Sequence, residues 1–188
     1  MSATVRDGKT PGILSEVGVA RGALIAALVV FAVALQSTLL ARLTLLGVRP
    51  QLVLVVVVCL AFLDGERVGL VTGFFGGLLI DLLLPGSIIG LTALVYTCIG
   101  YGVGLFRQFA PTESVLSPVF GVAMASALAE FGYAAMAIML GQPWVSIGFT
   151  AKVAGLVVLY NSLMTPFAFP LVRRVADRFR PERVHTWS

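Results

Sequence analysis

The sequence contains few of the side chains on which enzymes and metal sites depend. Only 12% of its 188 residues are charged, and it has a single histidine, His185, in the C-terminal tail. The motifs G-x-S-x-G and H-E-x-x-H, the P-loop and the dinucleotide-binding fingerprint do not occur in it. The sequence therefore predicts a protein that is not an enzyme and that binds no metal and no cofactor.

Cysteine usage and charge distribution exclude further classes. Cys59 and Cys98 lie inside apolar runs, where an isolated cysteine packs as a small hydrophobic side chain, so we expect no disulfide framework. The net charge is +4, but no basic patch is interleaved with aromatic residues. This pattern argues against nucleic acid as a partner.

Apolar residues, in contrast, are abundant and continuous. They make up 59% of the sequence, and the mean hydropathy is +1.00. A soluble domain of this composition could not cover its surface with polar groups, and the apolar runs reach the roughly 20 residues that span a hydrocarbon core. We therefore predict an all-α, polytopic membrane protein.

Charged residues, prolines and glycines divide the chain into segments. We expect a cytoplasmic N-terminal tail (1–21), a membrane domain (22–172) and a basic cytoplasmic C-terminal tail (173–188). The apolar segments expected to cross the membrane are 22–40, 52–63, 68–84, 91–106, 118–140 and 152–172. The second of them is short for a crossing, so its apolar length alone does not decide whether it spans.

The basic residues decide the number of crossings. Both ends of the chain are basic, and the positive-inside rule places both in the cytoplasm, which requires an even number of crossings. With six crossings, only three of the 13 basic residues lie on the outer side, namely Arg42, Arg49 and Lys152. We therefore predict six transmembrane helices with both termini cytoplasmic.

A ridge of glycines in segment 68–84 ends in an acidic residue. The positions that recur every four residues, and so share one helix face, are Gly69, Gly73, Gly77 and Asp81. Glycines at this spacing let another helix approach backbone to backbone, and Gly100 and Gly104 form a similar pair. The ridge is either a docking face for a partner or a packing face within the protein; we favour internal packing for most of these glycines.

Asp81 requires compensation inside a bilayer. A carboxylate at mid-depth costs about 2.5–3.5 kcal/mol on insertion scales, and near the C-terminal end of its helix it also opposes the helix dipole. We expect a partner among the polar groups around Ser87 or Thr92, or among the outer cations. Those candidate counter-charges are Arg42, Arg49 and Lys152. A tether between helix ends explains Asp81 slightly better than a catalytic or transport role.

Glu130 is the second acid within the membrane domain, near the middle of segment 118–140. An ionisable group at this depth is by default a candidate functional residue. The sequence leaves open whether it faces a cavity, a partner helix, or the polar side chains of Asn161 and Gln36.

The C-terminal tail is rich in arginine. Its basic residues are Arg173, Arg174, Arg178, Arg180 and Arg183. Near a membrane surface each contributes about 1 kcal/mol of attraction to anionic lipid, and an acidic cytoplasmic partner is an alternative ligand. The simplest interpretation is that they anchor the topology.

The chain resembles the MreD family of bacterial rod shape-determining proteins. The resemblance lies in Arg49-Pro50-Gln51-Leu52 before an apolar run, in the G-x-x-x-G-x-x-x-G-x-x-x-D ridge that ends at Asp81, and in Gly90-Leu91 and Gly100-Tyr101. It covers nearly the whole chain, with most of its specificity between Pro50 and Phe106. Many members of the family have an acid where this chain has Gln51.

The resemblance implies a non-enzymatic component of the elongation machinery in the bacterial inner (cytoplasmic) membrane. Such proteins act with MreC, the MreB filament, RodA and the elongation transpeptidase to direct lateral peptidoglycan synthesis and maintain rod shape. The implied mechanism is assembly, in which the chain packs against the single membrane helix of an MreC-like protein.

Two alternatives belong to other classes. Six short hydrophobic helices are also typical of the substrate-binding component of energy-coupling-factor vitamin transporters. Such a carrier needs an outer pocket with convergent polar and aromatic groups, for which only Asp81, Trp144 and Lys152 are candidates here. A structural lipid-binding protein is the third interpretation.

Overall fold

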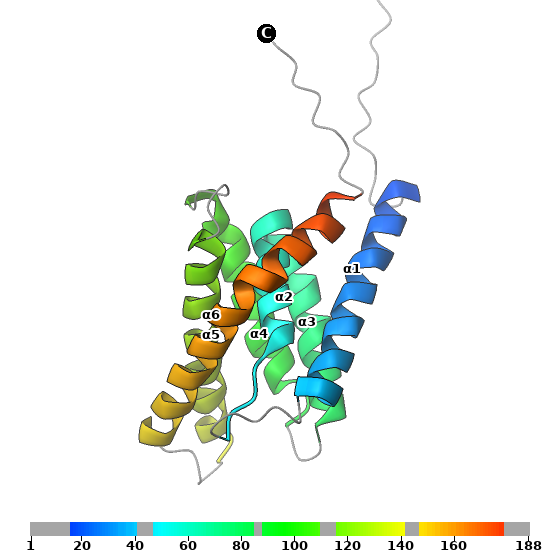
Figure 1. The fold of residues 1–188 in the computed structure, drawn as a ribbon. Coiled ribbons are helices and arrows are strands. Elements are labelled where there is room, and N and C mark those ends of the chain that lie inside the picture. The colour runs from blue at the N-terminus through cyan, green and yellow to red at the C-terminus, as the bar shows by residue number, and fades with distance from the viewer. Residues whose placement is uncertain (1–15, 41–46, 85–87, 110–115, 142–146, 179–188) are drawn as a thin grey trace, which may run out of the picture.

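The computed structural model describes residues 16–40, 47–84, 88–109, 116–141 and 147–178. These residues are helical nearly throughout, as Figure 1 shows, which confirms the all-α prediction. The elements in chain order are α1 (Glu16–Leu35), the π-helix η1 (Gln36–Leu40), α2 (Leu52–Asp64), α3 (Glu66–Leu83), α4 (Leu91–Phe106), the 3₁₀-helix η2 (Arg107–Phe109), α5 (Leu116–Met139) and α6 (Ile147–Asp177).

The helices agree with the predicted segments except at the ends of the longest ones. Segment 91–106 has the predicted bounds. The first helix begins at Glu16 rather than 22, and α6 begins at Ile147 rather than 152 and continues to Asp177. A charged residue at the membrane surface ends an apolar run but not a helix, because the helical backbone can continue into water.

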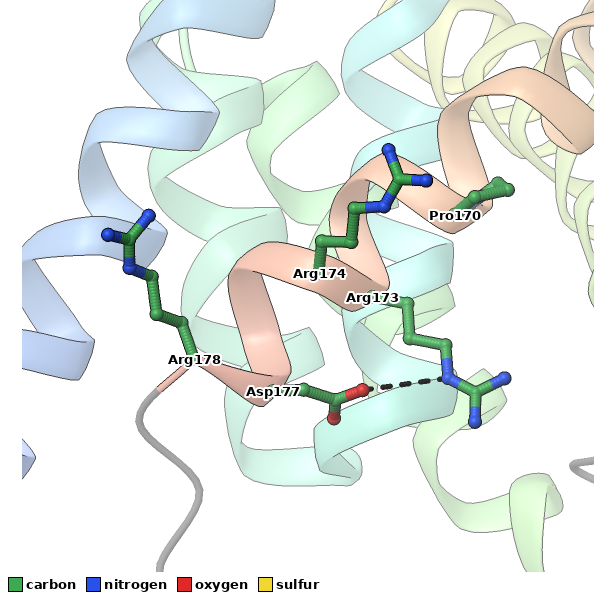
Figure 2. Close-up of a pocket in the computed structure, with 5 residues that line it drawn as sticks. All are labelled: Pro170, Arg173, Arg174, Asp177 and Arg178. Atoms are coloured by element: carbon green, nitrogen blue, oxygen red, sulfur yellow. Dashed lines mark ion pairs between the residues drawn. The ribbon is translucent and has the colours of Figure 1, made fainter.

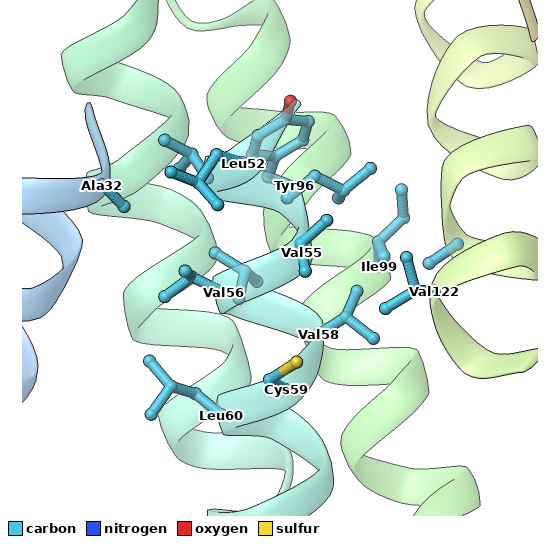
Figure 3. Close-up of a cluster of buried hydrophobic side chains, with 14 of the residues drawn as sticks. Ala32, Leu52, Val55, Val56, Val58, Cys59, Leu60, Tyr96, Ile99 and Val122 are labelled. Carbon is cyan, nitrogen blue, oxygen red and sulfur yellow. The ribbon is translucent and has the colours of Figure 1, made fainter. Parts of the chain in front are cut away.

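The short helix α2 forms the centre of the bundle. Every residue from Leu52 to Ala61 is buried, and α2 contacts each of the other five α-helices. Figure 3 shows α2 side chains such as Val55 and Cys59 between Ala32 of α1 and Val122 of α5. An apolar helix that is buried on all sides belongs to the core rather than to the lipid-facing surface.

The outer surface of the bundle is apolar. Large side chains such as Phe31, Phe120 and Phe167 are between 60% and 79% exposed. Among the described residues, three helical stretches are long and apolar enough to cross a membrane: Gly18–Leu39, Leu116–Met139 and Gly148–Asp177. So large an exposed apolar surface fits a protein whose solvent is lipid.

Both chain ends of the described bundle lie on the same side. In Figure 1 the start of α1 and the end of α6 are at the top, next to the end of α2. Arg21 at that end pairs with Asp64, the last residue of α2. We call this the basic end, because Arg21, Arg107 and Arg174 lie there.

Candidate functional site

The glycine ridge of α3 packs against α4 inside the protein. A Cβ atom added to Gly69 would lie 2.3 Å from the carbonyl oxygen of Gly100, and one added to Gly73 would lie 2.4 Å from that of Tyr96. A Cβ added to Gly77 would lie 2.6 Å from the Cα of Ala93. Only glycine allows such an approach between two helix backbones.

The glycines of α4 take part in the same contact. A Cβ on Gly100 would lie 2.2 Å from the carbonyl oxygen of Gly69, and one on Gly104 would lie 2.3 Å from the Cα of Glu66. The face on which these glycines lie is therefore occupied by the α3–α4 contact. A partner that docks on this chain needs another surface.

Asp81 caps the N-terminus of α4. Its carboxylate is 2% exposed, and Oδ2 accepts hydrogen bonds from the backbone N–H groups of Gly90 at 2.9 Å, Thr92 at 3.0 Å and Ala93 at 3.3 Å. The N-cap residue Gly90 has φ +95° and no side chain with which to cap the helix. The carboxylate thus meets the positive end of the α4 dipole and the N–H groups that the helix leaves without partners.

Of the three cations proposed for Asp81, the structure describes two. Arg49 and Lys152 are exposed, and within the described residues neither forms an ion pair with Asp81. Arg42 lies outside the described residues, as do Ser87 and Trp144. Among the groups expected around Asp81, the contact that the structure describes is with the backbone at Thr92.

Glu130 contacts the residue that precedes α2. The side-chain amide of Gln51 donates to its Oε1, and the Tyr96 hydroxyl donates to Gln51 Oε1 at 3.3 Å. Helices α4 and α5 are thereby joined to the start of α2 by side chains. Sequence reasoning did not predict the contact between Gln51 and Glu130, which lie 79 residues apart.

Two further side chains accept hydrogen bonds from backbone N–H groups where α2 begins. Asn161 Oδ1 of α6 accepts from the N–H of Gln51 at 3.0 Å, and Gln36 Oε1 of η1 accepts from that of Val53 at 2.8 Å. Asn161 also donates to the hydroxyl of Ser126 at 2.9 Å. Of the surroundings considered for Glu130, the structure supports the polar one. Asn161 and Gln36 belong to the same polar cluster as Glu130, but the side chain that Glu130 contacts directly is Gln51.

A second set of polar contacts closes the opposite end of α2. Arg21 of α1 pairs with Asp64, and Arg107 Nη1 donates to the carbonyl oxygen of Leu63 at 2.9 Å. Gly65, at φ +95°, is the only residue between α2 and α3. Sequence reasoning placed these arginines on the inner side but did not predict their partners.

An apolar groove lies between α4 and α5, with Phe62 of α2 at one end. Its volume is about 580 Å³. Small residues that line it include Cys98, Gly102 and Gly132, and larger ones include Leu94, Phe106, Leu128 and Met136. The lining in the described part of the chain is apolar throughout, unlike that of a vitamin-binding pocket, which needs polar groups to orient its ligand.

Comparison with known proteins identifies the family. The model of the rod shape-determining protein MreD family matches residues 19–175, which include all six α-helices of the described residues except the first three residues of α1 and the last two of α6. No curated protein and no solved structure matches the chain. The chain therefore belongs to the MreD family, the non-enzymatic, rod shape-determining membrane proteins of the bacterial elongation machinery.

Proposed function

We propose that this chain is a membrane scaffold that holds the single transmembrane helix of an MreC-like partner in the groove between α4 and α5. Through that contact it keeps the partner beside the other proteins of the elongation complex. The observation that carries the proposal is the groove itself, because it is apolar, elongated and lined by small residues.

The dimensions of the groove fit a helix. Its lining extends from Leu94 to Phe106 along α4 and from Gly121 to Met136 along α5. At 1.5 Å per residue these stretches are about 18 and 22 Å long, which is about four turns of a partner helix. Small residues allow close approach between helices in lipid, where packing rather than the hydrophobic effect drives association.

Because the glycine ridge of α3 is already packed against α4, the groove is the better docking surface for a partner. Gly69 and Gly73 are already in contact with α4. On the groove, Gly102 has no atom within 4 Å of an added Cβ, so this position is open to a partner.

The test fills the groove without disturbing the fold. Gly102→Leu should reduce the amount of MreC-like partner that co-purifies with the chain from detergent at least about fivefold, an effect of about 1 kcal/mol. The matched control is Gly155→Leu on α6, where an added Cβ also has no atom within 4 Å. The control should co-purify like the wild type, and neither variant should melt at a lower temperature than the wild type, because both positions are open and glycine is a weak helix former.

Either of two results would contradict the proposal. Unchanged co-purification of Gly102→Leu would mean that the partner docks elsewhere. Equal loss in Gly102→Leu and Gly155→Leu would mean that bulk on any exposed helix face disturbs assembly.

We also infer six crossings with both ends in the cytoplasm. The inference is supported by the position of both ends of the bundle on one side in Figure 1 and by the basic residues Arg21, Arg107 and Arg174 at that side. On the opposite side, Arg49 precedes α2 and Lys152 lies in the second turn of α6.

The shortness of α2 is compatible with a crossing. Its 13 residues extend about 20 Å, less than the hydrocarbon thickness of about 30 Å. Residues 47–51 precede it as non-helical chain, and Figure 1 shows them leading up to the helix. Non-helical backbone is tolerated at membrane depth where protein surrounds it, and Asn161 and Gln36 accept from the backbone where α2 begins.

A further inference from the structure

One face of α6 is apolar from Leu159 to Leu171 and then becomes cationic. Leu159, Leu163, Phe167 and Leu171 follow one another at intervals of four residues and are 61%, 68%, 79% and 51% exposed. Arg174 and Arg178 continue the same stripe by steps of three and four, and both are exposed. Residues at these intervals share one face of a helix.

The two arginines on this stripe differ from their neighbour Arg173. Arg173 Nε lies 3.5 Å from Asp177 Oδ2. In Figure 2, Arg173 reaches toward Asp177, whereas Arg174 and Arg178 extend to the other side of the helix. Within the described residues neither Arg174 nor Arg178 forms an ion pair.

A shallow hollow surrounds these side chains. Its volume is about 500 Å³, and it is lined by Pro170, Arg173, Arg174, Asp177 and Arg178. Like charges four residues apart on a helix repel each other, and the dipole at the helix C-terminus offsets this repulsion only in part. An anion placed between Arg174 and Arg178 removes the repulsion, and guanidinium groups bind phosphate oxygens in bidentate fashion.

We propose that this face of α6 binds an anionic phospholipid. The phosphate of the headgroup lies between Arg174 and Arg178, and an acyl chain follows Leu171, Phe167 and Leu163. The stripe has the same order of apolar and charged parts as such a lipid, and the change occurs where the helix leaves the membrane. An acidic protein segment would complement the charge of the arginines, but it would leave the exposed apolar side chains of the stripe uncovered.

The test uses the full chain, purified in detergent and examined by native mass spectrometry with added phosphatidylglycerol or phosphatidylcholine. The wild type should bind phosphatidylglycerol more tightly than phosphatidylcholine. Each arginine contributes about fivefold to this preference, so that Arg174→Gln with Arg178→Gln should lower it about 25-fold. The double variant should keep the wild-type melting temperature, because both side chains are exposed.

The matched control removes the same charge from outside the hollow. It combines Arg67→Gln with Lys152→Gln, two exposed cations that do not line the hollow. The control should keep the preference for phosphatidylglycerol. A similar loss in both double variants would mean that net charge alone selects the lipid, and it would overturn the proposal.

Two soluble probes distinguish a lipid site from a plain anion site. Inorganic phosphate and glycerophosphoglycerol, which lacks acyl chains, should not displace bound phosphatidylglycerol at millimolar concentration. Displacement by either would show that the apolar stripe contributes nothing and would overturn the proposal. So would equal binding of the two lipids by the wild type. The proposal requires only that α6 spans the membrane, and a failure of partner docking in the α4–α5 groove leaves it intact.

Discussion

At the scale of single residues, Asp81 shows how a carboxylate is accommodated within an apolar bundle. It lies near the C-terminal end of α3, where its own helix dipole disfavours it. The N-terminus of α4 is close by, because Gly73 and Gly77 bring the two helices into backbone contact. There the carboxylate accepts from three N–H groups that Gly90 cannot cap. The acid and the glycine ridge are thus parts of one arrangement.

Removal of this cap should destabilise the protein. Asp81→Ala leaves buried N–H groups of α4 without the carboxylate, and we expect the free energy of unfolding to fall by about 2 kcal/mol. Asp81→Asn keeps an acceptor oxygen and should lose less. Thermal unfolding in detergent measures both effects. Asp177→Ala, which removes an exposed ion pair with Arg173, serves as the control and should change stability by less than about 1 kcal/mol. Equal losses at the two aspartates would contradict the capping role.

At the scale of elements, the packing of α3 on α4 could be predicted from local sequence, whereas the contacts at the start of α2 could not. The four-residue period of Gly69, Gly73 and Gly77 can be read from one helix, which is why the ridge and its packing character were predictable. Asn161 lies 110 residues from the N–H group that it binds. Helical periodicity does not reveal such contacts, because they depend on how helices are arranged in space.

The same reasoning explains where the predicted helix ends were inaccurate. Segment 91–106 is bounded by Gly90 and Arg107, and its limits were predicted correctly. Lys152 interrupts the apolar run of α6 but lies inside the helix, so hydropathy placed the start too late. Sequence patterns thus located the six α-helices of the described residues, whereas the ends that leave the membrane and the contacts across the bundle depend on the tertiary structure.

The close contact of α3 with α4 leads to a prediction for the pair. Gly73→Ala places a Cβ at 2.4 Å from the carbonyl oxygen of Tyr96, a backbone atom that cannot rotate away. The two helices must separate, and we expect a loss of about 1–3 kcal/mol in the free energy of unfolding. At Gly155 the same substitution meets no atom within 4 Å and should leave stability unchanged or raise it by up to about 1 kcal/mol. Thermal unfolding of the two variants in detergent compares them directly, and an equal effect would exclude packing as the cause.

At the scale of the whole molecule, the bundle has an apolar centre, an apolar surface and polar contacts at both ends of α2. At one end of α2, Arg21 pairs with a carboxylate and Arg107 donates to a backbone carbonyl oxygen. At the other end, Asn161 and Gln36 accept hydrogen bonds from backbone N–H groups. Because these side chains come from α1, α6, η1 and the segment after α4, they hold α2 in register with its surroundings. A central helix fixed in this way supports the outer helices, including the pair α4 and α5 that forms the apolar groove.

The proposed orientation of this bundle predicts which side of the membrane each exposed residue faces. In a variant whose Cys59 and Cys98 are replaced by alanine, single cysteines are introduced at four exposed positions and treated with a membrane-impermeant maleimide. Arg49→Cys and Lys152→Cys should react in intact spheroplasts, whereas Arg67→Cys and Arg178→Cys should react only after permeabilisation, because positively charged ends are retained in the cytoplasm. Reaction of Arg67→Cys and Arg178→Cys from opposite sides would require an odd number of crossings between them and would contradict the six-crossing arrangement. Reaction of all four from the reverse sides would keep the number of crossings and invert the orientation.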